Sequence, residues 1–183
     1  MSALGLLARD VGVDERTLRR AVAAGTLRGS RTSPRKLELA LSEREYVRRS
    51  WGLISMLRAG LRTERNVHLA VLFGSTAQGI DTPESDIDLL VDLRDDTLAR
   101  TLDLKAKLAG LMGRPVDLVA LADVETEPSL LAQIVRDGRV LVDRNGAWGA
   151  LRAREGQLRR RGEQVDARRA KSALAAIDSM LST

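Results

Sequence analysis

The mostly apolar run VHLAVLF, residues 67–73, constrains the fold of this chain more than any other segment. An apolar run of this length that stops sharply at Gly74 and Ser75 is typical of a strand buried on both faces. Similar patterns predict three further short strands, at 87–93, 115–121 and 139–142. Segments with helical spacing separate the strands, so the sequence predicts an α/β (α+β) fold with a small mixed sheet.

The first forty residues predict two short helices joined by a turn. Helical spacing begins near Leu4 and breaks at Gly12. Asp14 is a suitable N-cap for a second helix, which stops at Gly25. The following stretch, 27–39, is rich in Arg and Lys and is predicted to form either a basic loop or a short wing.

Two longer helices are predicted elsewhere, one from about residue 42 to Arg62 and one over 150–181, with shorter helices at 96–112 and 130–135. The stretch Ser42-Glu43-Arg44-Glu45 has the spacing of a capping box, which marks the start of the first long helix. We therefore predict four parts: a helical module at 1–40, a connecting helix at 41–63, a sheet-forming domain at 64–147 and a basic C-terminal helix at 148–183.

The composition excludes several kinds of functional site. With no Cys and one His, the chain has no thiolate ligand and too few imidazoles for a zinc site. Aromatic residues make up 2%, too few for a platform on which single-stranded nucleic acid stacks. No apolar segment approaches the roughly 18 residues of a membrane span, and the N-terminus does not resemble a secretory signal. We therefore expect no membrane partner and a cytoplasmic location.

Charge is distributed unevenly along the chain, whose net charge is +5. Residues 1–50 and 148–183 are basic, whereas residues 81–147 are acidic. Basic ends favour polyanionic partners, and clustered carboxylates in the middle favour a bound cation. The alternative in each case is an ordinary solvated surface.

The most informative residues lie where the first predicted strand ends and the second begins. Gly74 permits a ligand to approach the backbone closely, and exposed N–H groups beside the Ser75 hydroxyl suit phosphate oxygens. Asp86 and Asp88 are two residues apart on a predicted strand, so both carboxylates are expected on one face. Asp117, in the third strand, completes a cluster of three carboxylates if that strand lies beside the second.

A magnesium or manganese ion suits this arrangement. Mg²⁺ prefers oxygen ligands and binds through one or two carboxylates together with substrate phosphates. Metal ions held in this way stabilise the attacking and leaving oxygens of an in-line displacement at phosphorus. Three acids beside a phosphate-binding turn are therefore the parts that nucleotidyl transfer requires. The alternative for Asp117, which follows a proline closely, is that it caps a turn.

This pattern resembles the signature of the minimal nucleotidyltransferases of the DNA polymerase beta-like superfamily. The match runs through Gly74, Ser75, Asp86, Asp88 and Asp117, and the resemblance covers roughly residues 64–145. It implies a nucleotidyltransferase domain that uses Mg²⁺ or Mn²⁺ and an NTP, with ATP as the expected substrate. In this resemblance the three aspartates bind metal and carry catalysis, and the Gly-Ser turn binds the nucleotide.

Gln78 belongs to the same nucleotide-binding turn and departs from the family pattern. Many minimal members carry Arg at the corresponding position, shortly before the glycine that matches Gly79. A glutamine supplies no charge to a triphosphate. The basic residues considered as substitutes are Arg62, Arg65 and the arginines of the C-terminal helix.

The N-terminal segment resembles a helix-turn-helix, in which Gly12 lies in the turn between two short helices. The resemblance implies that the second helix enters a major groove of DNA, with Arg16, Arg19 and Arg20 near bases or phosphates. The alternative is a small helical lobe that packs on the catalytic domain.

The C-terminal helix allows two interpretations. Its arginines form a track for RNA or an acidic partner, or else they are the solvated side of a docking helix: Arg152, Arg154, Arg159, Arg160, Arg161, Arg168 and Arg169. An apolar stripe follows at Ala170, Leu174, Ile177 and Leu181. We expect this stripe to pack within the chain or on another subunit of a homo-oligomer.

The fusion of a helix-turn-helix to a minimal nucleotidyltransferase resembles a component of a prokaryotic toxin–antitoxin system. The resemblance implies an antitoxin that transfers AMP to a HEPN-type toxin partner and binds operator DNA. One alternative is a toxin that adds nucleotides to tRNA, and the basic C-terminal helix keeps it open. A second is a non-catalytic DNA-binding repressor with a degenerate nucleotidyltransferase domain, which Gln78 favours and the three acids oppose. A third is an enzyme that modifies a small molecule.

Overall fold

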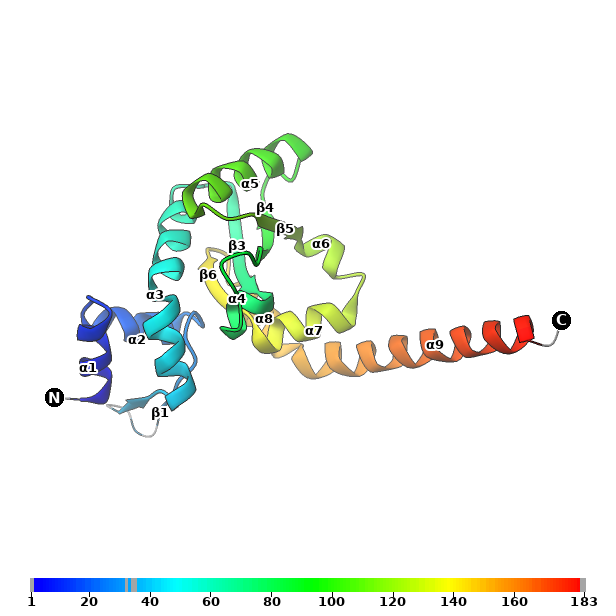
Figure 1. Cartoon of the computed structure of the whole chain (residues 1–183), viewed down its shortest axis with the longest axis horizontal. Helices are drawn as coiled ribbons and strands as arrows, with labels where there is room; N and C mark the ends of the chain where they lie inside the picture. The colour runs from blue at the N-terminus through cyan, green and yellow to red at the C-terminus, as the bar shows by residue number, and fades with distance from the viewer. Residues whose placement is uncertain (1, 32, 34–35, 182–183) are drawn as a thin grey trace.

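A four-stranded mixed sheet forms the centre of the molecule (Figure 1). The computed structural model describes residues 2–31, 33 and 36–181. β3 is antiparallel to both of its neighbours, β4 and β6, whereas β4 and β5 are parallel. The mixed sheet confirms the predicted fold class. In spatial order the strands are β5 (Val116–Ala120), β4 (Ile87–Leu93), β3 (Val67–Phe73) and β6 (Arg139–Asp143).

Helices cover both faces of this sheet because the residues of β3 alternate between the faces. Ala70 and Leu72 belong to an apolar cluster with α3 and α5. Leu69 and Val71 belong to a second cluster with α7 and α8. The two clusters explain why β3 is apolar along nearly its whole length. The helices are α3 (Leu41–Arg62), α5 (Leu98–Met112), α7 (Pro128–Asp137) and α8 (Ala147–Ala153).

Two short helices and a two-stranded ribbon form the N-terminal part of the chain. Between α1 (Ala3–Asp10) and α2 (Glu15–Ala23), Asp14 caps the second helix by accepting a hydrogen bond from Thr17 N at 2.6 Å. The ribbon pairs β1 (Ser30–Arg31) with β2 (Leu37–Glu38) in antiparallel fashion. The basic stretch after α2 therefore forms the short wing rather than a loop alone. Residues 32, 34 and 35 within it lie outside the described residues.

The prediction of a capping box at the start of α3 is wrong. Leu41 begins the helix after Ala40, which makes no side-chain capping bond, so Ser42 already lies inside the helix. The Glu43 side chain is buried and binds Arg139 and the backbone N–H of Arg28. The Glu43 carboxylate therefore joins distant parts of the chain.

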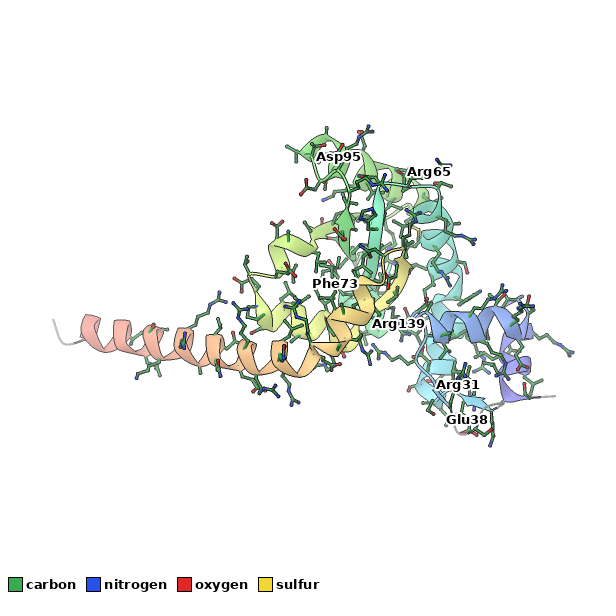
Figure 2. The ribbon with its side chains drawn as sticks, turned by 180° about the vertical axis from the view of Figure 1, so that it is seen from behind. Arg31, Glu38, Arg65, Phe73, Asp95 and Arg139 are labelled. Atoms are coloured by element: carbon green, nitrogen blue, oxygen red, sulfur yellow. The ribbon has the colours of Figure 1, made fainter. Side chains whose placement is uncertain are left out.

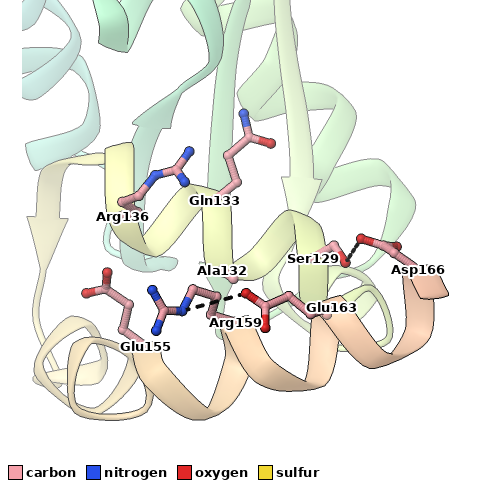
Figure 3. A pocket seen from close by; sticks show the side chains of 9 residues that line it. Ser129, Ala132, Gln133, Arg136, Glu155, Arg159, Glu163 and Asp166 are labelled. Carbon is pink, nitrogen blue, oxygen red and sulfur yellow. Dashed lines mark hydrogen bonds and ion pairs between the residues drawn. The ribbon is translucent and has the colours of Figure 1, made fainter.

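The C-terminal segment forms two helices, not the single helix predicted. A break at Arg154 separates α8 from α9 (Glu155–Leu181). The glycines at 156 and 162 lie within α9 and do not interrupt it. Gly162 instead permits close packing, because a Cβ there would lie 2.8 Å from Ser129 Oγ on α7. Figure 3 shows α9 alongside α7, where Ser129 also donates a hydrogen bond to Asp166 at 2.7 Å.

The last turns of α9 extend away from the body of the molecule (Figure 1). Leu174 and Ile177 are 64% and 52% exposed, and Ala170 is exposed as well. The expectation that this stripe packs within the chain is therefore wrong for these three residues, and packing on another subunit stays a prediction. The side chain of Leu181 lies outside the described residues. None of the described helices is both long enough and apolar enough to span a membrane.

The N-terminal helices and the sheet share one apolar cluster. Leu7 and Leu18 from α1 and α2 and Leu57 from α3 belong to the same cluster as Leu72 from β3. Because this cluster crosses the boundaries at 40 and 63, the division of the chain into four parts stays a prediction.

Candidate active site

The turn after β3 is built around a glycine that no other residue can replace without strain. Gly74 has φ +69° and begins the short helix α4 (Gly74–Gln78), which follows directly from the extended Phe73. A Cβ on Gly74 would lie 2.2 Å from Asp88 Oδ2. The turn therefore lies directly against a carboxylate, as the Gly-Ser and Asp-x-Asp pattern predicts.

Strand register brings the three predicted aspartates to one end of the sheet. Asp88 is opposite Phe73 in the antiparallel pair and opposite Asp117 in the parallel pair. Asp86 lies in the turn just before β4 rather than on the strand. Asp88 is half-buried, whereas Asp86 and Asp117 are exposed.

The carboxylates of Asp86 and Asp117 lie close enough to affect the ionisation of Asp88. Burial raises the pKa of Asp88, and the negative charges of Asp117 and then Asp86 raise it further. A cation placed among these carboxylates would stabilise their ionised forms. A perturbed group of this kind is also typical of functional sites.

Asp117 has a partner that the sequence did not indicate. Lys105 on α5 donates a hydrogen bond from Nζ to Asp117 Oδ1 at 2.7 Å. Among the residues that the structure describes, no group of three or more His, Cys, Asp and Glu side chains is arranged to hold a metal ion. Asp117 is bound by a lysine, whereas Asp86 and Asp88 have no cationic partner among the described residues.

The loop between α4 and β4 is held by two arginines that sequence reasoning missed. Arg114 binds Asp81 Oδ2 at 3.0 Å and donates to the carbonyl of Ser85. Arg49 on α3 donates to the carbonyl of Gly79. Together they fix the segment that leads to Asp86. Each arginine is far in sequence from the residue that it holds, so no local pattern marks it.

Two of the basic residues considered as substitutes for the charge missing at Gln78 are at the wrong end of the sheet. Arg62 and Arg65 precede β3, whereas Gly74 follows it. A seven-residue strand is roughly 20 Å long, too far for either side chain to reach the turn. Figure 2 shows Arg65 and Phe73 well separated along the sheet. Gln78 itself is exposed at the end of α4.

The three arginines predicted to bind DNA have different surroundings. Arg16 and Arg20 are exposed on α2. Arg19 is half-buried and forms an ion pair with Glu15 at 2.5 Å on the same helix. Because Arg19 is already paired, Arg16 and Arg20 are the better candidates for contacting phosphates.

A pocket of about 250 Å³ lies between α7 and α9 (Figure 3). Arg136 and Arg159 line it together with Glu155 and Glu163. None of its lining residues belongs to the predicted site, and the mixed charges around it are those of a packed helix pair. The candidate active site is where β3 ends and β4 begins.

A family model matches the part of the chain that contains these residues. The family model described as polymerase beta, nucleotidyltransferase matches residues 56–147, about half of the chain. No curated protein matches it. A chain from a crystal structure of a toxin–antitoxin with AMP-PNP is 25% identical, with a TM-score of 0.48 and coverage of 70% of this chain and 98% of that one. A chain from the tri-AMPylated Shewanella oneidensis HEPN toxin in complex with an MNT antitoxin is 22% identical, with a TM-score of 0.41 and coverage of 72% and 95%.

Proposed function

This chain belongs to the polymerase beta nucleotidyltransferase family, and from that premise we propose that it transfers AMP from ATP to a protein partner in a toxin–antitoxin pair. The observation that carries the proposal is the close approach of Gly74 to Asp88, whose pKa is raised by burial and then by Asp117 and Asp86. A turn that is suited to phosphates therefore lies directly beside a group of acids, which supports the proposal.

The residues present fit a magnesium ion that is shared with a triphosphate. Asp86 and Asp88 offer carboxylate oxygens, the donors that Mg²⁺ prefers, and Mg²⁺ needs no more than one or two of them when phosphates complete its shell. Gly74 and Ser75 offer backbone N–H groups and a hydroxyl to those phosphates. Bound there, the metal supplies positive charge that stabilises the attacking and leaving oxygens.

The transfer forms one phosphorus–oxygen bond and breaks another. The hydroxyl oxygen of the acceptor forms a bond to the α-phosphorus of ATP, and the bond from that phosphorus to the bridging oxygen of pyrophosphate breaks. We assign the hydroxyl proton to Asp117, whose Oδ1 is held by Lys105 and whose Oδ2 is left to accept it. Lys105 thus orients the base for the proton transfer.

The nature of the acceptor rests on the arrangement of the two modules. Two helices joined by a turn and followed by a ribbon precede the nucleotidyltransferase domain, which supports the resemblance to toxin–antitoxin components. In that resemblance the antitoxin carries the nucleotidyltransferase and the HEPN-type toxin carries the acceptor hydroxyl. We place this chain in the antitoxin role.

Acceptor labelling tests this proposal. The purified protein is incubated with Mg²⁺, each α-phosphate-labelled NTP and host lysate, alongside the variant Asp86→Ala/Asp88→Ala. We expect label from ATP to enter a protein, to be removed by protease and to be absent with the variant. If no macromolecule is labelled above the level of the variant, transfer to a macromolecule is excluded, and a repressor or a small-molecule enzyme remains.

RNA is the second candidate acceptor, and the solvent side of α9 favours it. Arg160, Arg161 and Arg168 are exposed and form no ion pair with other described residues. By contrast, Arg169 binds Glu127 at 2.9 Å and Arg159 lies 3.9 Å from Glu163. Exposed, unpaired arginines are suited to phosphates. In the labelling experiment, label that is removed by RNase assigns the chain to the tRNA-modifying class.

DNA binding by the N-terminal module is a separate proposal with its own prediction. Exposed Arg16 and Arg20 are expected to contact phosphates, whereas Arg19 is held by Glu15. Replacing either exposed arginine with Gln is expected to make the slope of log affinity against log salt less negative by about 1. Titration of a mixed-sequence DNA duplex by fluorescence anisotropy at several salt concentrations measures the slope. Arg19→Gln serves as the matched control, and equal slopes for all variants and the wild type contradict the proposal.

A further inference from the structure

A buried arginine joins the sheet, the phosphate-binding turn and the N-terminal helices. Arg139 begins β6, and its side chain is 2% exposed. Its Nε donates to the carbonyl of Ala77 on α4 at 2.7 Å. Its two terminal nitrogens donate to the two carboxylate oxygens of Glu43 at 2.6 and 3.0 Å. Figure 2 places Arg139 where the sheet meets the N-terminal part of the chain.

The orientation of this guanidinium is fixed on every side. The pair with Glu43 is bidentate, and the guanidinium carbon lies 3.4 Å from the centroid of the Tyr46 ring. A buried charge is costly unless it is paired and hydrogen-bonded, so this geometry admits little freedom. A carbonyl that accepts from Arg139 is therefore held at a defined place.

That carbonyl belongs to the element that carries the phosphate-binding turn. A helix as short as α4, with five residues, does not hold its position through its own hydrogen bonds. Arg139 holds its C-terminal end at Ala77, while Gly74 at its other end lies against Asp88. A small displacement of α4 therefore changes the spacing between Gly74 and Asp88.

The segment that follows α2 binds both Glu43 and β6. The backbone N–H of Arg28 donates to Glu43 Oε1 at 2.9 Å. Thr26 Oγ1 donates to the carbonyl of Val140 at 2.6 Å, and Val140 N donates to the carbonyl of Gly25 at 3.1 Å. The segment directly after α2 is thus attached to β6 beside Arg139.

We propose that Arg139, oriented by Glu43, is a positioning residue that sets α4 and thereby the phosphate-binding turn against Asp88. It acts through Ala77 and touches neither nucleotide nor acceptor. The proposal that Arg139 affects ATP binding rests on the function proposed above, whereas its effect on α4 does not.

The variant Arg139→Lys tests the proposal. A lysine retains the positive charge opposite Glu43, but its hydrogen-bond donors lie on one ammonium nitrogen and not on a planar guanidinium. It therefore cannot bind the Ala77 carbonyl and both Glu43 oxygens at the same time. We expect the dissociation constant of Mg²⁺ and a non-hydrolysable ATP analogue to rise about tenfold, and KM for ATP to rise more than kcat falls. We also expect amide hydrogen exchange to accelerate in residues 74–79 of the ligand-free protein.

Arg144→Lys is the matched control. Arg144 follows β6 and also donates to backbone carbonyls, those of Leu61, Arg62, Glu64 and Val67, none of which belongs to α4. A general loss of stability lowers the melting temperature of both variants, whereas the change in exchange at residues 74–79 is expected in Arg139→Lys alone. Glu43→Gln, which retains shape and removes the charge, is expected to accelerate the same exchange to a smaller extent. It also serves as the second variant if Arg139→Lys does not fold.

The outcomes distinguish the two proposals. If the wild type does not bind the ATP analogue, the proposed function is wrong, and hydrogen exchange alone then decides the role of Arg139. If Arg139→Lys and Glu43→Gln leave both the affinity and the exchange at 74–79 unchanged, the positioning role is overturned.

Discussion

Asp88→Asn is expected to reduce AMP transfer by at least about a thousandfold. Asn has nearly the same shape as Asp but lacks the negative charge that binds a divalent cation. Asp88 is the carboxylate that both touches the Gly74 turn and is influenced by Asp86 and Asp117. The measurement is the initial rate of label transfer at saturating Mg²⁺ and ATP. Asp92→Asn, further along the same strand, is the control, and a comparable loss of activity there contradicts the assignment.

The same substitution is expected to stabilise the metal-free protein at neutral pH. Burial and two neighbouring carboxylates raise the pKa of Asp88 in the folded state above its unfolded value. A group of this kind contributes stability that is fully present below the unfolded pKa and is lost as the pH rises through the folded pKa. Asn removes this loss, so Asp88→Asn melts at a higher temperature than the wild type at pH 7, and the difference shrinks as the pH falls toward the unfolded pKa.

With magnesium and an ATP analogue present, the wild type is expected to melt at a higher temperature than Asp88→Asn. A ligand that binds only the folded state stabilises it, so Mg²⁺ with an ATP analogue raises the melting temperature of the wild type. Asp88→Asn is expected to show little of this increase, because it lacks one of the two carboxylates assigned to the metal. An equal increase in both proteins, measured by differential scanning fluorimetry with EDTA as the reference, places the metal elsewhere.

Gly74→Ala is expected to lower both stability and activity. The left-handed backbone, φ +69°, costs an alanine about 1–2 kcal/mol. Its Cβ would in addition lie 2.2 Å from Asp88 Oδ2, so either the turn or the carboxylate must move. We expect the rate of AMP transfer to fall at least about a hundredfold, because misplacement by an ångström has effects of that size.

Gly113→Ala separates these two causes. Gly113 has φ +63°, but a Cβ there meets nothing within 4 Å, so the variant carries the backbone strain without the collision. Chemical denaturation is expected to show a loss of stability in both variants, and a larger loss in Gly74→Ala. Activity is expected to fall only in Gly74→Ala. If both variants keep full activity, the contact of Gly74 with Asp88 has no catalytic role.

Local sequence determined the parts of this protein that depend on neighbouring residues. The apolar run at 67–73 defined β3 because a strand buried on both faces excludes polar side chains nearly everywhere. Gly74 marked the turn because the backbone there has a positive φ, and Asp14 and Gly25 marked the ends of α2 for similar local reasons. The Gly-Ser and Asp-x-Asp spacing then predicted where the turn and the carboxylates meet.

Tertiary structure decided the contacts between residues that are far apart in the chain. Glu43 is one of two glutamates near the start of a predicted helix, and nothing near it in the sequence indicates its partner. It binds Arg139, which is 96 positions away, because burial of that arginine requires a carboxylate partner. The Lys105 contact with Asp117 and the Arg114 contact with Asp81 arise in the same way, from elements brought together by the sheet. An arginine or a lysine looks the same in the sequence whether its partner is water or a distant carboxylate, and the partner is fixed only when the strands pair and the helices pack.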